Sequence, residues 1–318
     1  MRALVTGGSG FIGSHVVDKL LAEGIDVRIF DRVQSPFHEI DNNRIQFHQG
    51  KLTDLEDVQA ALQNTDIVFH LAAVANVNDV TDFPYRSELV NVRGTMNVLE
   101  AIRRGHQRRR IVYASTVWVY SLSEFENVKE STCIDDFDHF YTVTKYAGEL
   151  YCKSYSAMYG VPYTILRYGI PYGPHARPEA VIPIFVNKAF AGEPLTIAGE
   201  GQQWRKFVYV EDLADATVLA GLSGQAEGQT YNLEGREKVT IKGIVDTLAE
   251  VLDRTPLPDI TVEKIENRAG DFQGKEISCK KVKEELGWEP TTSFKRGLVE
   301  YIKWAKGEEM EQRGIRVL

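Results

Sequence analysis

The strongest constraint on the fold is a glycine-rich segment that begins at residue 7. An apolar, β-branched run over Ala3–Thr6 leads into Gly7, Gly10 and Gly13, and a helical pattern follows over His15–Glu23. The first glycine permits a tight turn, the second lets the backbone approach a phosphate, and the third allows the helix to pack closely on the strand. The free N–H groups at a helix N-terminus also favour an anion. Strand, turn and helix in this order predict a dinucleotide site.

Short β-branched runs alternate with amphipathic stretches through the first half of the chain. Strands are expected at residues 3–6, 27–30, 45–47, 67–70, 111–113 and 163–167, and long helices at 84–104 and 140–159. This alternation is typical of βαβ units with right-handed crossovers. We therefore expect an α/β fold of the Rossmann type, a doubly wound parallel sheet with helices on both faces.

The composition of the sequence changes after Tyr168, where prolines become frequent and the expected strands no longer alternate regularly with helices. We expect a cofactor-binding domain over residues 1–168 and a smaller α/β substrate-binding lobe over residues 169–318, with exchange of chain between them allowed. Elements expected in that lobe are helices at 184–191, 211–222 and 241–252, strands at 195–198 and 206–209, and two shorter C-terminal helices.

Composition and charge exclude several classes of protein. Of the 318 residues, 43% are hydrophobic and 26% are charged, as in an ordinary soluble globular protein. Three cysteines without a C-x-x-C pair argue against a disulfide framework and a metal site. The lack of a long apolar run or leader segment, and the net charge of −8, argue against a membrane span, secretion and nucleic-acid binding. A cytoplasmic protein is expected.

Five arginines lie between residues 103 and 110, at positions 103, 104, 108, 109 and 110. Because cations favour the negative end of the helix dipole, we interpret this cluster as the solvated end of the helix over 84–104.

The choice of cofactor depends on Asp31, which ends the second expected strand. A carboxylate at this offset can accept hydrogen bonds from the adenosine ribose diol, and it repels a 2′-phosphate. The neighbouring Arg32 could attract that phosphate, which leaves NADP as the less favoured alternative. We therefore expect NAD.

A tyrosine and a lysine four residues apart are candidate proton-transfer groups. Tyr141 and Lys145 lie in the expected helix over 140–159, where this spacing places both side chains on one face. A tyrosine that acts as a base near pH 7 needs its pKa lowered by about three units, or roughly 4 kcal/mol. A lysine ammonium and a positive nicotinamide ring could together supply this stabilisation.

Two hydroxyl residues, Ser115 and Thr116, follow the strand expected at 111–113. In open α/β sheets, ligands bind at the C-terminal ends of the strands. We expect Thr116, with Ser115 as a helper, to hydrogen-bond the oxygen of the substrate that reacts.

These motifs together resemble those of the extended short-chain dehydrogenases/reductases, and within them the group of NDP-sugar epimerases and dehydratases. The shared patterns T-G-x-x-G-F-I-G, H-x-A-A, N-x-x-G-T, the Ser/Thr strand end and Y-x-x-x-K occur here at Thr6–Gly13, His70–Ala73, Asn91–Thr95, Ser115–Thr116 and Tyr141–Lys145. The resemblance implies a homodimer. It also implies cofactor contacts from Gly7, Gly10, Phe11, Ile12, Gly13, Asp31, Arg32, Lys51, Leu52, Leu71, Ala72, Ala73, Asn91, Tyr141, Lys145 and Tyr168.

The resemblance continues through the second half of the chain, where Val181–Phe185, Gly199–Asp212 and Leu286–Pro290 look like the family's nucleotide-sugar lobe. Two arginines, Arg205 and Arg268, would bind the substrate diphosphate, since a guanidinium can pair with a phosphate through two hydrogen bonds. The full set of substrate contacts implied by the resemblance is Ser115, Thr116, Val181, Arg205, Tyr209 and Arg268.

Departures from the family pattern narrow the chemistry. The family's dehydratases follow the hydroxyl residue with Asp-Glu, and its decarboxylases place a Glu at the second of these positions, where this chain has Val117 and Trp118. Neither side chain can move a proton, which argues against 4,6-dehydration and C4 decarboxylation. Three other positions also differ from the family. Lys51 stands where an Asp usually binds adenine, and Ile170 stands where an Asn usually meets the substrate phosphate. Lys206 follows Arg205 where the family often has an Asp.

Three hypotheses remain. The leading one is an NAD-dependent C4 epimerase of a nucleotide sugar, a UDP-hexose or UDP-uronic acid, that acts through a transient 4-keto intermediate. The second is a 4-keto-sugar reductase or dehydrogenase that exchanges NAD(P) with solution. The third is a non-catalytic dinucleotide-binding sensor, in which Thr116, Tyr141 and Lys145 would be expected to be lost.

Overall fold

The structure is a computed structural model, which describes residues 1–40, 43–137, 139–252, 262–265 and 274–313. The chain forms two compact units. Unit 1 comprises Met1–Gly169, Leu213–Leu233 and Ile277–Glu289, and unit 2 comprises Ile170–Asp212, Glu234–Glu276 and Pro290–Leu318. The chain passes from unit 1 to unit 2 after Gly169 and then returns twice to unit 1.

Unit 1 is built on a seven-stranded sheet in the order β12-β7-β5-β4-β1-β2-β3. All neighbouring strands are parallel. The expected doubly wound α/β fold is therefore confirmed, and the six strands expected in the first 168 residues are present. The strands are β1 (Arg2–Thr6), β2 (Asp26–Asp31), β3 (Ile45–Gln49), β4 (Ile67–His70), β5 (Arg110–Thr116), β7 (Tyr163–Tyr168) and β12 (Thr230–Leu233).

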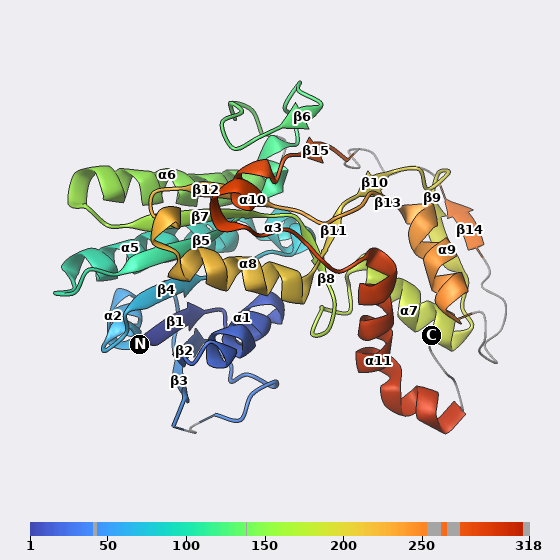
Figure 1. Ribbon diagram of the computed structural model, residues 1–318, viewed down its shortest axis with the longest axis horizontal. Coiled ribbons are helices and arrows are strands. Elements are labelled where there is room, and N and C mark those ends of the chain that lie inside the picture. Colours follow the sequence, from blue (N-terminus) through green and yellow to red (C-terminus); the bar gives the residue numbers. More distant parts are fainter. Residues whose placement is uncertain (41–42, 138, 253–261, 266–273, 314–318) are drawn as a thin grey trace. The chain divides into compact units, whose positions relative to one another are not determined.

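Helices cover both faces of this sheet (Figure 1). On one face lie α2 (Leu55–Leu62), α5 (Gly94–Arg104) and α6 (Phe140–Tyr159), and on the other lie α1 (Phe11–Ala22) and α8 (Val210–Leu222). Apolar side chains of α2, α5 and α6 pack on the buried strands to form a continuous core. A short 3₁₀ turn (Val117–Tyr120), β6 (Asn127–Val128), a second 3₁₀ turn (Gly224–Ala226), β15 (Glu276–Ile277) and α10 (Lys280–Leu286) complete the elements around the sheet.

The long helix expected at 84–104 has an interruption. It consists of α4 (Pro84–Glu88), a π-turn (Leu89–Arg93) and α5, and it is preceded by α3 (Val77–Asp82), which the sequence did not predict. The N–H of Gly94 donates to the carbonyl of Leu89, one residue further back than in an α-helix. The π-turn therefore inserts one extra residue into the helical path.

Unit 2 has its own core, with three pairs of short strands and three helices among its described residues. The pairs are β8 (Ile170–Tyr172) with β11 (Phe207–Tyr209), β9 (Leu195–Ala198) with β14 (Val262–Ile265), and β10 (Trp204–Arg205) with β13 (Val239–Thr240). The helices are α7 (Val181–Ala191), α9 (Ile241–Leu252) and α11 (Phe294–Arg313).

One expectation for the C-terminal helices was wrong, because α11, which was expected to be short, has 20 residues. Its apolar positions Phe294, Leu298 and Ile302 are four residues apart and buried in the core of unit 2, so one face is anchored along the first half of the helix.

The basic cluster at 103–110 is only partly a helix end. Arg103 and Arg104 lie in the last turn of α5 and pair with Glu100. Arg109 donates to the carbonyl of Thr65, and Arg110 donates to backbone carbonyls near the end of α8. Arg109 and Arg110 thus hold the start of β5 to the loop at Thr65 and to the end of α8.

No helix among the described residues is long and apolar enough to cross a membrane.

The packing of α8 on the sheet gives a stability prediction. A Cβ added at Gly221 would lie 2.4 Å from Cζ of Phe69, whereas one added at Gly224 would meet no atom within 4 Å. We expect Gly221→Ala to lower the free energy of unfolding by about 1–3 kcal/mol through overpacking. Gly224→Ala, the matched control, should change it by less than about 0.5 kcal/mol. Urea unfolding of both variants checks this, and equal effects would contradict the packing argument.

Candidate active site

The C-terminal ends of the central strands lie at one edge of the sheet of unit 1. Thr6 at the end of β1 is in register with His70 of β4, His70 with Tyr113 of β5, and Thr116 with Tyr168 of β7. The strand order reverses between β1 and β4, and ligands of open α/β sheets bind outside the strand ends at such a reversal.

The glycine turn lies directly at this reversal. Gly7 has a φ of +75°, and a Cβ there would lie 2.8 Å from the backbone of Ala72. A Cβ on Gly13 would lie 2.0 Å from the carbonyl oxygen of Gly7. Gly10 caps α1 without a side-chain hydrogen bond, and Phe11 and Ile12 form the first turn of that helix. The turn thus presents a bare helix N-terminus, which suits the pyrophosphate of a dinucleotide.

Asp31 ends β2 beside this turn. One carboxylate oxygen accepts from the N–H of Ser9 at 3.2 Å, and the other accepts from the N–H of Arg32 at 2.7 Å. Burial raises the pKa of Asp31, and these two N–H groups act against that shift. The N–H of Val33 acts in the same direction, and since a carboxylate has about four lone-pair sites, acceptor capacity remains for a ribose hydroxyl.

Lys51 and Leu52 follow β3. The N–H of Lys51 donates to the carboxylate of Asp57 at 2.9 Å, and the Leu52 side chain is buried against Gly94. The backbone of both residues therefore lies just after the C-terminal end of β3, and the Leu52 side chain points into the core.

A chain of hydrogen bonds joins the glycine turn to α5 through His70. Its Nδ1 lies 2.7 Å from the Thr6 hydroxyl, and its Nε2 lies 3.0 Å from the Thr95 hydroxyl. Because the Thr95 hydroxyl donates to the carbonyl of Asn91 at 2.6 Å, Nε2 is the donor to Thr95. Burial and the charge of Lys145 lower the pKa of His70 to about 3, so the ring is neutral.

The segment Leu71–Ala73 after β4 is fixed by the same region. The N–H of Leu71 donates to the carbonyl of Thr6, and that of Ala72 donates to the Thr6 hydroxyl at 3.3 Å. Asn91, in the π-turn, accepts from the N–H of Val74 at 2.7 Å and donates to the carbonyl of Val74 at 3.0 Å. Asn91 therefore supports the loop beside Ala73 with both ends of its amide.

Tyr141 and Lys145 lie one turn apart on α6. The ring of His139 caps this helix by accepting from the N–H of Tyr141 at 3.0 Å. The Lys145 side chain is buried, with Nζ 4.8 Å from the centre of the Tyr113 ring. Burial lowers the pKa of Lys145 to about 8, although the Cys152 and Glu149 side chains act to raise it.

The two hydroxyl residues at the end of β5 differ in their contacts. Thr116 caps the following 3₁₀ turn by accepting from the N–H of Trp118 at 3.2 Å. Ser115 instead donates to the carboxylate of Glu149 at 2.5 Å, inside the protein. The helix that carries Tyr141 and Lys145, α6, packs on β5, the strand that ends in Thr116, and the Ser115 proton is used by Glu149.

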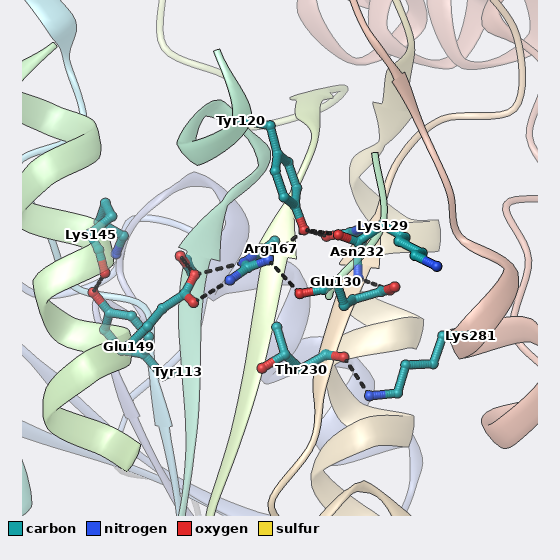
Figure 2. Close-up of polar contacts among 11 residues, drawn as sticks. Tyr113, Tyr120, Lys129, Glu130, Lys145, Glu149, Arg167, Thr230, Asn232 and Lys281 are labelled. Atoms are coloured by element: carbon teal, nitrogen blue, oxygen red, sulfur yellow. Dashed lines mark hydrogen bonds and ion pairs between the residues drawn. The ribbon is translucent and has the colours of Figure 1, made fainter. Parts of the chain in front are cut away.

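A buried ion pair that the sequence did not predict links α6 to β7 (Figure 2). Arg167 of β7 donates to Glu149 of α6 through Nε at 2.9 Å and Nη2 at 2.6 Å. The Glu149 and Arg167 side chains are 0% and 2% exposed. Two features of the sequence could have indicated this pair. One is a glutamate four residues after Lys145, and the other is a single arginine in an otherwise apolar strand.

Tyr168, expected to contact the cofactor, ends β7, but its side chain is buried. Its hydroxyl lies 2.8 Å from that of Thr217 on α8, and burial raises its pKa. The hydroxyl is therefore committed to the contact between sheet and helix.

The expected substrate contacts other than Ser115 and Thr116 belong to unit 2. Val181 begins α7, and Arg205 in β10 is largely buried and donates to the carbonyl of Trp204 at 2.8 Å. Tyr209 packs edge-on against Tyr172 in the core of unit 2. Arg268 lies outside the described residues.

Burial of Lys145 predicts a pH-dependent cost to stability. Its pKa falls from an ordinary 10.5 to about 8, so the native state binds fewer protons than the unfolded state between these values. The cost of the buried charge is full below pH 8 and disappears as pH rises through 10.5. It amounts to about 3 kcal/mol at most.

Lys145→Met should therefore be more stable than the wild type at pH 7, by about 1–3 kcal/mol. This advantage should shrink towards zero near pH 10.5, where the unfolded lysine also loses its proton. Urea unfolding of both proteins at several pH values measures the difference. A variant that is less stable than the wild type at pH 7 would show that the ammonium is favourably held.

Known proteins share both the sequence and the fold. A model of the NAD-dependent epimerase/dehydratase family matches residues 3–233. A putative UDP-glucose 4-epimerase of Methanocaldococcus jannaschii is 33% identical over 310 residues, which cover 95% of this chain and 98% of that protein. The UDP-N-acetyl-α-D-glucosaminuronate decarboxylase of Bacillus cytotoxicus is 30% identical over 316 residues, with coverage of 95% and 97%.

A solved structure agrees along the whole chain. The UDP-glucose 4-epimerase of Thermotoga maritima, solved with UDP-glucose, superposes with a TM-score of 0.87 at 30% identity, and covers 97% of this chain and 100% of its own. The family match covers the glycine turn, the Ser/Thr strand end and the Tyr-Lys pair. This chain therefore belongs to the NAD-dependent epimerase/dehydratase family, enzymes of the extended short-chain dehydrogenase/reductase type.

Proposed function

We propose that this protein is a C4 epimerase of a nucleotide sugar, a UDP-hexose or UDP-uronic acid, that acts through a transient 4-keto intermediate. The observation that carries the proposal is the pair that follows Thr116. Val117 and Trp118 begin the 3₁₀ turn after β5, and neither an isopropyl group nor an indole can act as the acid or base that dehydration would require. The groups that remain for proton transfer are suited to oxidising and reducing one hydroxyl.

Tyr141 is the proposed base. Its phenolate removes the proton from O4 of the sugar and returns it when the 4-keto sugar is reduced on the other face. A phenolate near pH 7 needs about 4 kcal/mol of preferential stabilisation, of which the Lys145 ammonium one turn away supplies a part. Thr116 hydrogen-bonds O4 and orients it.

NAD would be held by the glycine turn, Asp31 and Lys145. Gly7 and Gly13 permit a backbone packing that a Cβ would prevent, and the uncapped N-terminus of α1 that this packing leaves at the turn fits a pyrophosphate. NAD supplies the hydride acceptor and donor for C4, and the protein supplies binding, orientation and proton transfer.

Arg205 is the proposed contact to the substrate diphosphate, together with Arg268. Arg205 is largely buried and donates to the carbonyl of Trp204. The proposal rests on the chemistry of the guanidinium, which can pair with a phosphate through two parallel hydrogen bonds.

Product analysis tests the reaction. Purified protein given UDP-hexoses or UDP-uronic acids should form C4 epimers without added NAD(P)H, because the hydride returns to the same carbon. Tyr141→Phe should lower kcat by about 10²–10⁴-fold, the usual contribution of a general base. Product formation that consumes stoichiometric NAD(P)H would instead identify a 4-keto-sugar reductase.

Cofactor affinity tests the proposed turn. We expect Gly13→Ala to weaken NAD binding by tenfold or more, about 1.4 kcal/mol, because its Cβ would displace the Gly7 carbonyl. Gly307→Ala in α11, where a Cβ meets no atom within 4 Å, is the control and should bind like the wild type. Fluorescence titration with NADH measures both. Wild-type affinity in Gly13→Ala would exclude this turn as the pyrophosphate site.

A further inference from the structure

The Glu149 carboxylate lies one helical turn beyond Lys145, on the side away from Tyr141, and it is fully buried. Its oxygens accept three hydrogen bonds, two from Arg167 and one from the Ser115 hydroxyl. Ser115 and Arg167 are in register on neighbouring strands, β5 and β7. Glu149 thus ties α6 to the strand that ends in Thr116.

The helix is held against β5 at two further points. The Tyr113 hydroxyl donates to the carbonyl of Lys145 at 3.1 Å. At Gly148, an added Cβ would lie 2.1 Å from the same hydroxyl oxygen, so the helix approaches the strand as closely as its backbone allows. These contacts, with Glu149, fix the height and rotation of α6 just after its catalytic turn.

The titratable groups near Lys145 come from three elements, β4, β5 and α6. His70 of β4 is neutral, since burial lowers its pKa to about 3. Burial raises the pKa of both the Tyr113 hydroxyl on β5 and the Cys152 thiol on α6, so both stay protonated near neutral pH. Glu149, ion-paired with Arg167, is the remaining member of this group, and it contributes the negative charge.

The far side of Arg167 is satisfied separately. Its Nη1 donates to the Tyr120 hydroxyl and to the carbonyl of Glu130, and the Tyr120 hydroxyl in turn donates to Asn232 of β12 at 3.0 Å (Figure 2). The Glu130 carboxylate accepts from the N–H of Asn232 at 2.9 Å. Glu130 therefore belongs to the same network without touching Ser115 or α6 in the contacts described.

We propose that Glu149 is a positioning residue for the reaction: through Ser115 and α6 it sets the places of Thr116, Tyr141 and Lys145, and it supplies the negative charge that Lys145 faces. This rests on the proposed function in that Tyr141 and Lys145 move the proton. Ser115 is then a link in the support of Thr116, and Thr116 is the hydroxyl that meets the substrate.

The test is the ionisation of Tyr141 in Glu149→Gln, which keeps the shape of the side chain and removes its charge. Ultraviolet difference titration against Tyr141→Phe in the same background isolates the tyrosinate of this residue without any sugar. Without its anion, Lys145 loses its proton at lower pH and stabilises the phenolate less. We expect the tyrosinate to form at a pH higher by about 0.5 or more.

The direction of this shift is diagnostic. Glu149 lies two turns from Tyr141, roughly 12 Å along the helix, and direct loss of a negative charge at that distance would move the titration slightly downward. An unshifted or downward-shifted titration in Glu149→Gln would therefore overturn the proposal. Glu130→Gln, which removes a charge from the outer part of the network, should titrate like the wild type.

Kinetics and folding controls complete the experiment. Glu149→Gln should lower kcat for C4 epimerisation by about tenfold or more, with KM changed much less, because positioning is lost while the binding groups remain. If the wild type makes no C4 epimer, the proposed function fails, and the titration still decides the role of Glu149. Should Glu149→Gln not fold, the double variant E149M/R167M, in which apolar side chains replace the pair, is read by the same titration.

Discussion

The bidentate ion pair between Glu149 and Arg167 is the interaction that holds α6 to β7 and, through Ser115, to β5. A buried ion pair stabilises a fold only when its geometry is good and its remaining donors and acceptors are satisfied. Here the Ser115 hydroxyl donates to the carboxylate, and the guanidinium donates to the Tyr120 hydroxyl and to the carbonyl of Glu130. The pair therefore joins α6, β5, β7 and the distant β12 at a depth where neither charge could remain alone.

A second, neutral chain of hydrogen bonds holds the cofactor side of the sheet. It joins three residues that are far apart in the sequence, since the His70 ring lies within hydrogen-bond distance of the Thr6 hydroxyl on one side and the Thr95 hydroxyl on the other. The H-x-A-A and N-x-x-G-T patterns thus have a mechanical reason in this chain, because they fix the loop after β4 to the glycine turn. The C-terminal ends of the central strands are thus held by two hydrogen-bond networks, one through His70 and one through Glu149 and Arg167.

The sequence predicted the features that depend on local pattern. The strands, the turn at Gly7 and the spacing of Tyr141 and Lys145 follow from alternation, glycine placement and helix geometry. Partners chosen by sheet register could not be predicted in the same way: Ser115 meets Glu149 only because β5, β7 and α6 come together. The commitment of the Tyr168 hydroxyl to α8 likewise depends on a helix that follows much later in the chain.

The π-turn at Leu89–Arg93 has a consequence for how this protein can change in evolution. A helix rotates by about 100° per residue, so the extra residue of the turn sets the rotational phase between the two helices that flank it. Loss of any one residue there would restore the ordinary register and swing the amide of Asn91 away from the backbone of Val74. Substitutions on the outer side of this stretch are compatible with the site, whereas single-residue insertions and deletions are not. The position of the Asn91 amide therefore depends on the length of this stretch more than on its composition.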